Sequence, residues 1–394
     1  MKKFITLLLT VVMVLLCSCK VTDTTDIKTS YNFETDVPYF YRTGDAINPI
    51  AISPDGYYFI GDFGIAIYVD KNTMKGTPLC NKPNCDHTDR ETCNAYISKS
   101  IGHFIQYYKG YIYTLNEVYN ADKQYYEPIL ARYNLDGTGF KSMTNPINLS
   151  EAGSVADCFI HRGYFYYSTF YGIYRLSMDN LKGEAEKLYK VKNKEEECNN
   201  IHCLNAYGNY LYFEPFEIND EGETEEINYS LNLKTLELKK LADNVAGFFN
   251  DRLITAKGDP DKDKIYYRIC DLDGGNSRKY ETLPIDDELR FDPLRKLHYV
   301  QINNDSIFPE KLTAYDSKGK ELYSTDLPKN SEISFTPQDE NYFFEIRTQE
   351  DKNGKAKKWL WYANKTDVGN ELKFKKLCKL SWAKIELPGY ITVG

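Results

Sequence analysis

Short runs of tyrosine and other aromatic residues return along the chain at a nearly constant interval. Each run follows a turn residue and is rich in the aromatic and β-branched residues that strands favour. The successive turn residues lie 54, 53, 46, 42, 45 and 45 positions apart. Repetition at this interval predicts one four-stranded blade per repeat, and hence an all-β fold made of a single β-propeller. The turn residues are Gly56, Gly110, Gly163, Asn209, Asp251, Lys296 and Asn341.

A second strand pattern follows the first in most repeats. It runs into Asp, Asn or Gly and then into a leucine-bearing strand, as in the segment that begins with ILARYNLDGTG at Ile129. Because Asp, Asn and Gly accept the positive φ of tight turns, this pattern predicts a hairpin of two further strands. These hairpins resemble the third and fourth strands of TolB-type propellers, and of uncharacterised lipid-anchored propeller lipoproteins from gut anaerobic Gram-positive bacteria. The resemblance covers nearly the whole chain that follows the N-terminal segment.

The seven turn residues predict seven blades, which together occupy residues 31–394. A surplus strand pair lies around Leu380 to Ile385 and Tyr390 to Val393. We expect it to pair with the strands YNFE and PYFYR near the N-terminus, because such pairing closes the ring and protects strand edges. A composite blade made in this way leaves eight blades as the alternative to seven.

The first eighteen residues read as an export signal. Two lysines precede an apolar core from Phe4 to Leu16, which is shorter than the ~20 apolar residues of a membrane-spanning helix. The string LCSC resembles a bacterial lipobox, and this resemblance implies that Cys19 receives a lipid and becomes the mature N-terminus. A plain cleaved signal or a short membrane anchor is the alternative. Residues 19–30 are polar and are expected to form a tether.

The charge balance narrows the choice of partners. A net charge of -8 lacks the basic footprint of a nucleic-acid-binding protein, so we expect no nucleic-acid partner. Charge does not hold an acidic protein on an anionic membrane. Attachment is therefore expected through the lipid on Cys19, with the protein on the outer side of the cell membrane.

Four metal-type donors lie within fourteen residues of the connection between the first and second blades. Three thiolates and one imidazole are the donors of a tetrahedral structural zinc site, so one zinc ion is the favoured cofactor. A disulfide to the last cysteine of the group and three free thiols are the alternatives. The segment also resembles a recurrent element of the lipoproteins named above. The four donors are Cys80, Cys85, His87 and Cys93.

The remaining cysteines divide into two groups. Cys198 and Cys203 lie in the connection between the third and fourth blades, where a local disulfide is favoured over metal binding or free thiols. Cys158, Cys270 and Cys378 fall in or beside predicted strands. We expect these three to be small buried apolar residues.

The predicted loops differ in length between the two faces of the propeller. Connections from the second to the third strand of a blade, and between blades, open on one face and are long, so we name it the long-loop face. The opposite, tight-turn face carries short connections. Loops carry function on a rigid scaffold, and aromatic side chains there suit stacking on sugar rings or anchoring a protein partner. Packing under their own loops is the alternative. These residues are Tyr119, Tyr125, Tyr126, Phe170, Tyr171, Phe216 and Phe308.

Local catalytic signatures are missing from the sequence. It contains no G-x-S-x-G elbow, no H-E-x-x-H pair and no phosphate-binding glycine loop. We therefore predict a non-catalytic cell-surface module that binds an extracellular glycan, a peptide or an envelope protein. A polysaccharide-acting enzyme with its site at the propeller tunnel is the alternative, since residues from separate blades leave no local motif.

Lipidation is directly testable. We expect a labelled fatty acid to enter the wild-type protein and not the Cys19→Ser variant, because only Cys19 combines an apolar run with a small preceding residue. The measurement is incorporation of label into the purified protein. Equal labelling of both proteins would contradict the assignment.

Overall fold

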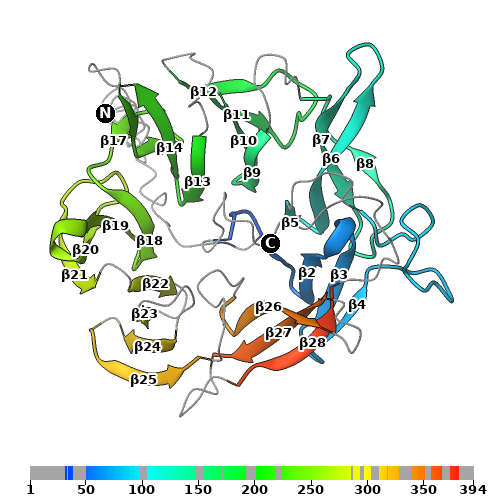
Figure 1. The fold of residues 1–394 in the computed structure, drawn as a ribbon. Coiled ribbons are helices and arrows are strands. Elements are labelled where there is room, and N and C mark those ends of the chain that lie inside the picture. The colour runs from blue at the N-terminus through cyan, green and yellow to red at the C-terminus, as the bar shows by residue number, and fades with distance from the viewer. Residues whose placement is uncertain are drawn as a thin grey trace, which may run out of the picture. The chain divides into compact units, whose positions relative to one another are not determined.

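The computed structural model of the chain contains seven antiparallel sheets arranged around a common centre (Figure 1). Its described part has no α-helix, and no helix there is long and apolar enough to cross a bilayer. Two single-turn 3-10 segments, η2 (Asp62–Gly64) and η3 (Pro260–Lys262), lie in loops. The protein is therefore an all-β propeller with seven blades, as predicted. The described residues are 32, 34–38, 50–97, 104–147, 155–170, 172–191, 201–218, 223–284, 287–292, 297–302, 310–316, 318–327, 339–350, 356–365 and 373–380.

The first four blades each run outward from the centre in chain order. Blade one contains β1 (Ile50–Ile52), β2 (Gly56–Ile60), β3 (Ala66–Asp70) and β4 (Lys75–Pro78). Blade two contains β5 (Ile105–Tyr108), β6 (Tyr111–Asn120), β7 (Tyr125–Tyr133) and β8 (Lys141–Ser142). Blade three contains β9 (Val155–His161), β10 (Tyr164–Thr169), β11 (Gly172–Ser177) and β12 (Glu186–Lys190). Blade four contains β13 (Ile201–Tyr207), β14 (Tyr210–Ile218), the short β15 (Thr224–Glu226), β16 (Tyr229–Asn232) and β17 (Leu238–Lys240).

The last three blades repeat this arrangement. Blade five contains β18 (Asn244–Phe249), β19 (Arg252–Asp259), β20 (Lys264–Cys270) and β21 (Arg278–Pro284). Blade six contains β22 (Glu288–Asp292), β23 (Leu297–Ile302), β24 (Lys311–Asp316) and β25 (Glu321–Asp326). In blade seven the described strands are β26 (Tyr342–Glu350), β27 (Ala356–Asn364) and β28 (Lys375–Lys379).

Gly56 begins β2, and Gly110, Gly163, Asn209 and Asp251 directly precede the second strands of blades two to five. Asn341 directly precedes β26, the first described strand of blade seven. The β9–β10 turn shows why the sequence marks these positions. Arg162 and Gly163 have φ values of 45° and 85°, and a two-residue hairpin turn with positive φ at both positions matches the twist of the flanking strands. The same geometry recurs at Lys109 and Gly110. The regular spacing in the sequence is therefore the spacing of these hairpins.

Aromatic side chains of neighbouring blades fill the space between the sheets. Tyr212 of blade four packs against Phe248 of blade five, with ring centroids 5.2 Å apart. Tyr57 of blade one lies 4.8 Å from Phe344 of blade seven in an edge-to-face pair. Such pairs combine buried apolar area with about 0.5–1.5 kcal/mol each of ring–ring attraction. The core is thus divided among the interfaces between blades.

Buried tyrosine hydroxyls also find their hydrogen-bond acceptors in the next blade. A hydroxyl buried without a partner is costly, so each such bond fixes how far one blade can slide past its neighbour. The bonds run from Tyr57 to Asp339, from Tyr58 to the Leu135 carbonyl, from Tyr207 to Asp251 and from Tyr212 to the Leu272 carbonyl, at 2.5, 3.2, 2.8 and 2.7 Å.

Blade seven packs directly on blade one and closes the ring. Leu360 and Cys378 of blade seven share a buried cluster with Phe59 and Ile67 of blade one, and β28 lies beside β4. The predicted closure by pairing of the two chain ends falls largely outside the described residues. Where the N-terminal end is described, Glu34, the last residue of the expected strand YNFE, lies in a turn instead.

This turn belongs to a segment that we name the N-terminal strap (residues 34–38), which lies against the β9–β10 turn on the tight-turn face. The backbone N–H of Arg162 donates to the Thr35 carbonyl at 2.6 Å. The Arg162 guanidinium donates one hydrogen bond to each carboxylate oxygen of Asp36, both at 3.1 Å, and Asp36 is only 4% exposed. A bidentate pair of this kind is strong and directional, so it holds the strap in place.

His161 connects the strap to two blades. Its Nδ1 accepts the Val37 backbone N–H at 3.2 Å, and its Nε2 donates to the Gly208 carbonyl of blade four at 2.8 Å. Both bonds require the neutral ring, in which one nitrogen accepts and the other donates. Complete burial lowers the pKa of His161 to about 4.

We expect acid to destabilise the fold through His161. The folded-state pKa of about 4 lies below the ordinary 6.5, so the unfolded chain gains its proton first, and stability falls as the pH drops through this window. The loss attributable to His161 is on the order of 3 kcal/mol. Urea denaturation of the wild type between pH 7 and pH 4.5 should show a steeper loss of stability than that of His161→Gln. Identical pH dependence in both proteins would contradict the role of the buried imidazole.

Candidate metal centre and long-loop face

The connection from β4 to β5 folds into a compact group of turns on the long-loop face. Asn84 and His87 have φ values of 59° and 58°, so the chain reverses twice within a few residues. The ammonium of Lys82 donates to the Thr92 carbonyl and joins the two arms of the connection. Cys93 ends a turn in which its N–H donates to the Asp89 carbonyl at 3.0 Å. These turns bring together side chains that are up to thirteen positions apart.

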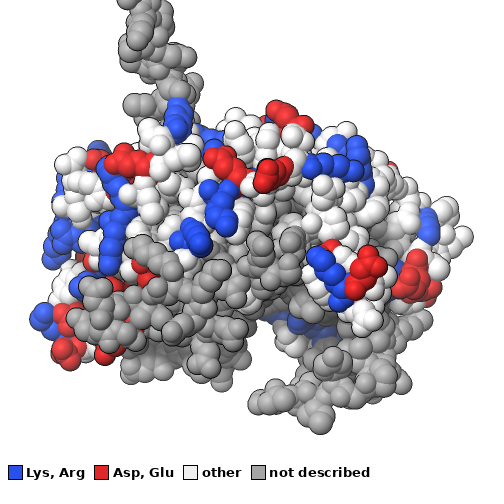
Figure 2. Space-filling model, turned by 90° about the horizontal axis from the view of Figure 1, so that it is seen from above, with Lys and Arg blue, Asp and Glu red and all other residues white. Residues whose placement is uncertain are grey.

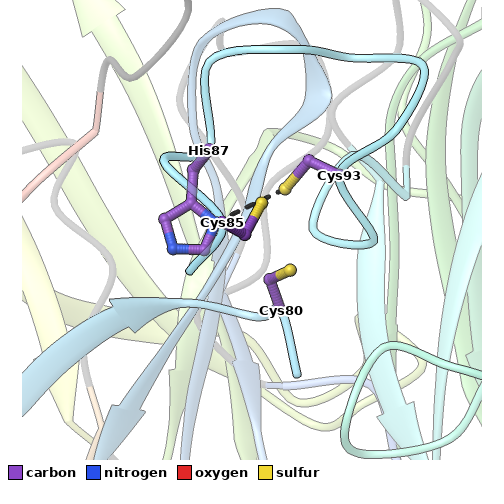
Figure 3. A group of neighbouring side chains, drawn as sticks. All are labelled: Cys80, Cys85, His87 and Cys93. Atoms are coloured by element: carbon purple, nitrogen blue, oxygen red, sulfur yellow. Dashed lines mark hydrogen bonds between the residues drawn. The ribbon is translucent and has the colours of Figure 1, made fainter. Parts of the chain in front are cut away.

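The four predicted donors meet in this connection. Figure 3 shows one side chain from the end of β4 and three from the turns gathered in one place. Their ligand atoms all lie within 4.8 Å of one another, and the three cysteines are free thiols. His87 Nδ1 lies 3.4 Å from Cys93 Sγ, close to the roughly 3.5–3.8 Å edges of a tetrahedron around a metal bound to sulfur and nitrogen. The group Cys80, Cys85, His87 and Cys93 could therefore hold a metal ion.

The pKa values of the cysteine thiols show why this group of donors needs a bound cation. Burial raises the pKa of the Cys93 thiol to about 12, and the neighbouring sulfurs of Cys85 and Cys80 add to the rise. Burial also disfavours the Cys80 thiolate, but backbone N–H groups of Lys82 and Asn94 donate to its sulfur and leave the pKa of Cys80 lowered. Three neighbouring thiolates need a cation to be ionised together.

Blade one holds in place the group of Cys80, Cys85, His87 and Cys93, which we name the metal-type group. The Ala66 N–H donates to the Ala95 carbonyl at 2.7 Å, and Ile65 forms a bridge with Tyr96. The Tyr96 hydroxyl then donates to the His87 carbonyl at 3.0 Å. Ile65, Tyr96 and the cysteines form a small apolar cluster of their own, so the group is a satellite core attached to the ring.

The other cysteines behave differently. Cys158, Cys270 and Cys378 are buried at 4%, 1% and 7% exposure, which confirms the prediction that they are small core residues. Burial raises the pKa of the thiols of Cys270 to about 11 and of Cys378 to about 12. The predicted Cys198–Cys203 disulfide stays a prediction, because Cys198 and the side chain of Cys203 lie outside what the structure describes.

The β6–β7 hairpin carries three of the predicted face aromatics on the long-loop face. Tyr119 and Tyr126 are opposite one another in the strand register, with ring centroids 5.2 Å apart. They are 56% and 60% exposed, so this pair faces solvent. Tyr125 lies at the next position, where the Lys123 ammonium sits 5.6 Å from its ring.

The other face aromatics are less prominent. Phe170 lies in the β10–β11 turn and Phe216 in β14, and both are partly buried. Tyr171 and Phe308 lie outside the described residues. The structure therefore pairs Tyr119 with Tyr126 and places Tyr125 at the adjacent position of the same hairpin.

Sequence reasoning missed an aromatic and basic group on blade seven. Trp359 and Trp361 occupy alternate positions of β27 and so share one side of the sheet. Arg347 of β26 and Lys376 of β28 lie over their rings. The pattern Trp-x-Trp, preceded by two lysines, was the available signal. On the one side of the molecule that Figure 2 shows, the described residues mix basic and acidic side chains without one dominant sign.

Comparison with known proteins finds only distant structural similarity to β-propeller-containing proteins. No family model matches the chain, and no curated protein does. Among solved structures, dipeptidyl peptidase 4 of Porphyromonas gingivalis is similar at 10% identity and a TM-score of 0.44, over 88% of this chain and 56% of that one. The β-propeller domain of the Trilobed protease from Pyrococcus furiosus is similar at 12% identity and a TM-score of 0.47, over 70% and 82%. The chain thus spans little more than half the length of the dipeptidyl peptidase.

Proposed function

We propose that the protein is a lipid-anchored cell-surface propeller that binds an extracellular glycan, peptide or envelope protein through its long-loop face, without catalysis. The exposed pair of Tyr119 and Tyr126 carries this proposal. Two neighbouring tyrosines that keep more than half of their surface in water are costly to display unless a partner covers them. The export signal ending at Cys19 and the resemblance to lipid-anchored propellers support the location.

The hairpin that presents these tyrosines is suited to recognition. At ten and nine residues, β6 and β7 are twice as long as β5 or more, so the pair stands at the end of a rigid ladder. Glu127 accepts hydrogen bonds from Lys123 and Asn120, both at 2.9 Å, and fixes the turn. Rigid amphipathic rings lose little entropy when a partner binds, which is why tyrosine is common in binding sites.

The metal centre takes a structural part in this function. We propose that Cys80, Cys85, His87 and Cys93 bind one zinc ion, because a complete set of protein donors closes a structural site and leaves no position for substrate. The zinc would supply the positive charge that lets all three thiols ionise. Its role would be to fix the β4–β5 connection on the same face as the tyrosine hairpin.

The zinc proposal predicts a stoichiometry. Purified protein should carry about one zinc per chain by elemental analysis, and Cys85→Ser should lose both the metal and thermal stability, because metal binding is part of the folding free energy of such a site. Cys270→Ala, which removes a thiol from the ring core, should keep the metal. Protein without metal, but with a disulfide in the intact mass, would assign the site to the disulfide alternative.

The binding proposal predicts which aromatics matter. A glycan and peptide array probed with the mature protein should give a ligand whose affinity falls about tenfold or more in the double variant Tyr119→Ser and Tyr126→Ser, as expected for buried aromatic anchors. Phe140 is the matched control, since it is 57% exposed but lies in the β7–β8 connection on the tight-turn face. Equal weakening by Phe140→Ser, or turnover of the bound ligand, would contradict the proposal.

A further inference from the structure

Blade seven differs in charge from the rest of the chain. Its outer strands β27 and β28 contain five lysines and no acidic residue, within a chain of net charge -8. Two of the three tryptophans of the protein lie in β27. A basic and aromatic sheet in an acidic protein calls for an explanation other than general solubility.

The side chains on one side of this sheet form a group that we name the tryptophan strip. Opposed residues in a sheet share a side, and the register pairs Arg347 with Trp359 and Lys376 with Trp361. Arg347 lies three residues from the end of β26, so this part of the hairpin is directed to the long-loop face. The strip consists of Arg347, Gln349, Trp359, Trp361 and Lys376.

The two cations of the strip differ in whether a carboxylate balances their charge. The Arg347 guanidinium lies 4.8 Å from the Trp361 ring, and its Nη2 donates to Glu345 at 2.7 Å, so its charge is already balanced. The Lys376 ammonium lies 3.4 Å from the centre of the Trp359 ring and donates to Gln349 Oε1 at 3.0 Å. Among the described residues no carboxylate pairs with Lys376. An exposed lysine thus holds its ammonium above an indole.

Resting on the proposed binding function, we infer that the tryptophan strip binds an acidic polysaccharide. A uronic acid offers both complementary parts. Its carboxylate pairs with the Lys376 ammonium, and the C–H face of its ring packs against the exposed part of the tryptophans as an apolar surface on an aromatic one. The lysines along β27 and β28 attract the neighbouring carboxylates of the same chain.

A polysaccharide fits this strip better than a membrane surface does. Tryptophans that insert into a membrane interface protrude from the protein, whereas Trp359 and Trp361 are half-buried in a sheet and lie under cations. A flat, partly covered indole side suits a ribbon-like chain of sugars. The balanced Arg347 keeps Trp361 oriented, and Lys376 is left to make the ionic contact.

The test compares two exposed lysines that lie on opposite sides of the sheet. Lys358 is adjacent to Trp359 and on the opposite side of β27, so Lys358→Glu changes the net charge as much as Lys376→Glu does. The mature protein is titrated with polygalacturonate at low salt, with tryptophan fluorescence and the dissociation constant as readouts. We expect binding to weaken about tenfold or more in Lys376→Glu and by less than about twofold in Lys358→Glu. Neutral dextran should not bind.

The following outcomes would contradict the inference that the tryptophan strip binds an acidic polysaccharide. If both lysine variants weaken polygalacturonate binding equally, the effect comes from net charge in general, and the assignment of the binding site to the strip is wrong. Failure to bind polygalacturonate would also overturn it, as would binding to phosphatidylglycerol vesicles alone, which would assign the surface to a membrane. The double variant Tyr119→Ser and Tyr126→Ser is measured in parallel. If that variant loses binding while Lys376→Glu does not, the proposed binding function is supported and only the inference about the tryptophan strip is contradicted.

Discussion

The ring depends on burying tyrosine between blades without stranding its hydroxyl. A tyrosine ring contributes a large apolar area, but its hydroxyl must find an acceptor once water is excluded. Here Tyr57 and Tyr212 place their rings in the seam between two sheets and their hydroxyls on an acceptor of the next blade. These two seams are therefore both apolar and polar, and the polar part fixes the register of one blade on the next.

The group of four metal-type donors concerns the stability of the β4–β5 connection. A connection that leaves the ring cannot reach the seams, so it needs its own source of stability. Ile65 and Tyr96 provide a minimal apolar base, and four donor atoms within 4.8 Å provide a place for a cation. A cation bound there would cross-link the connection and give it defined geometry where too little apolar area is available.

Local turn chemistry made the blades predictable from the sequence. Gly110 and Gly163 have positive φ with no neighbouring atom near the missing Cβ, so backbone freedom alone selects glycine there, and such positions are visible in one sequence. The donor set of the metal-type group was visible because its four members are close in the chain. Their convergence was not visible, because it needs the left-handed backbone of His87.

Non-local contacts account for what the sequence did not reveal. The predicted strand YNFE ends at Glu34, which lies in a turn instead. The carboxylate of Asp36, at the end of this turn, is bound by Arg162, 126 positions away. The tryptophan strip was missed for the same kind of reason. Tryptophans in a strand read as core residues, and only the register of three strands shows that Arg347 and Lys376 lie over Trp361 and Trp359.

The N-terminal strap also determines how the ring bears a mechanical load. A force applied at the N-terminal end reaches the blades through Asp36 and Arg162, which form two parallel hydrogen bonds, and through His161, which passes it to the Gly208 carbonyl of the next blade. Bonds that share a load break together instead of one after another. A load on the N-terminal end would then be shared by blades three and four, and not carried by the edge of a single blade.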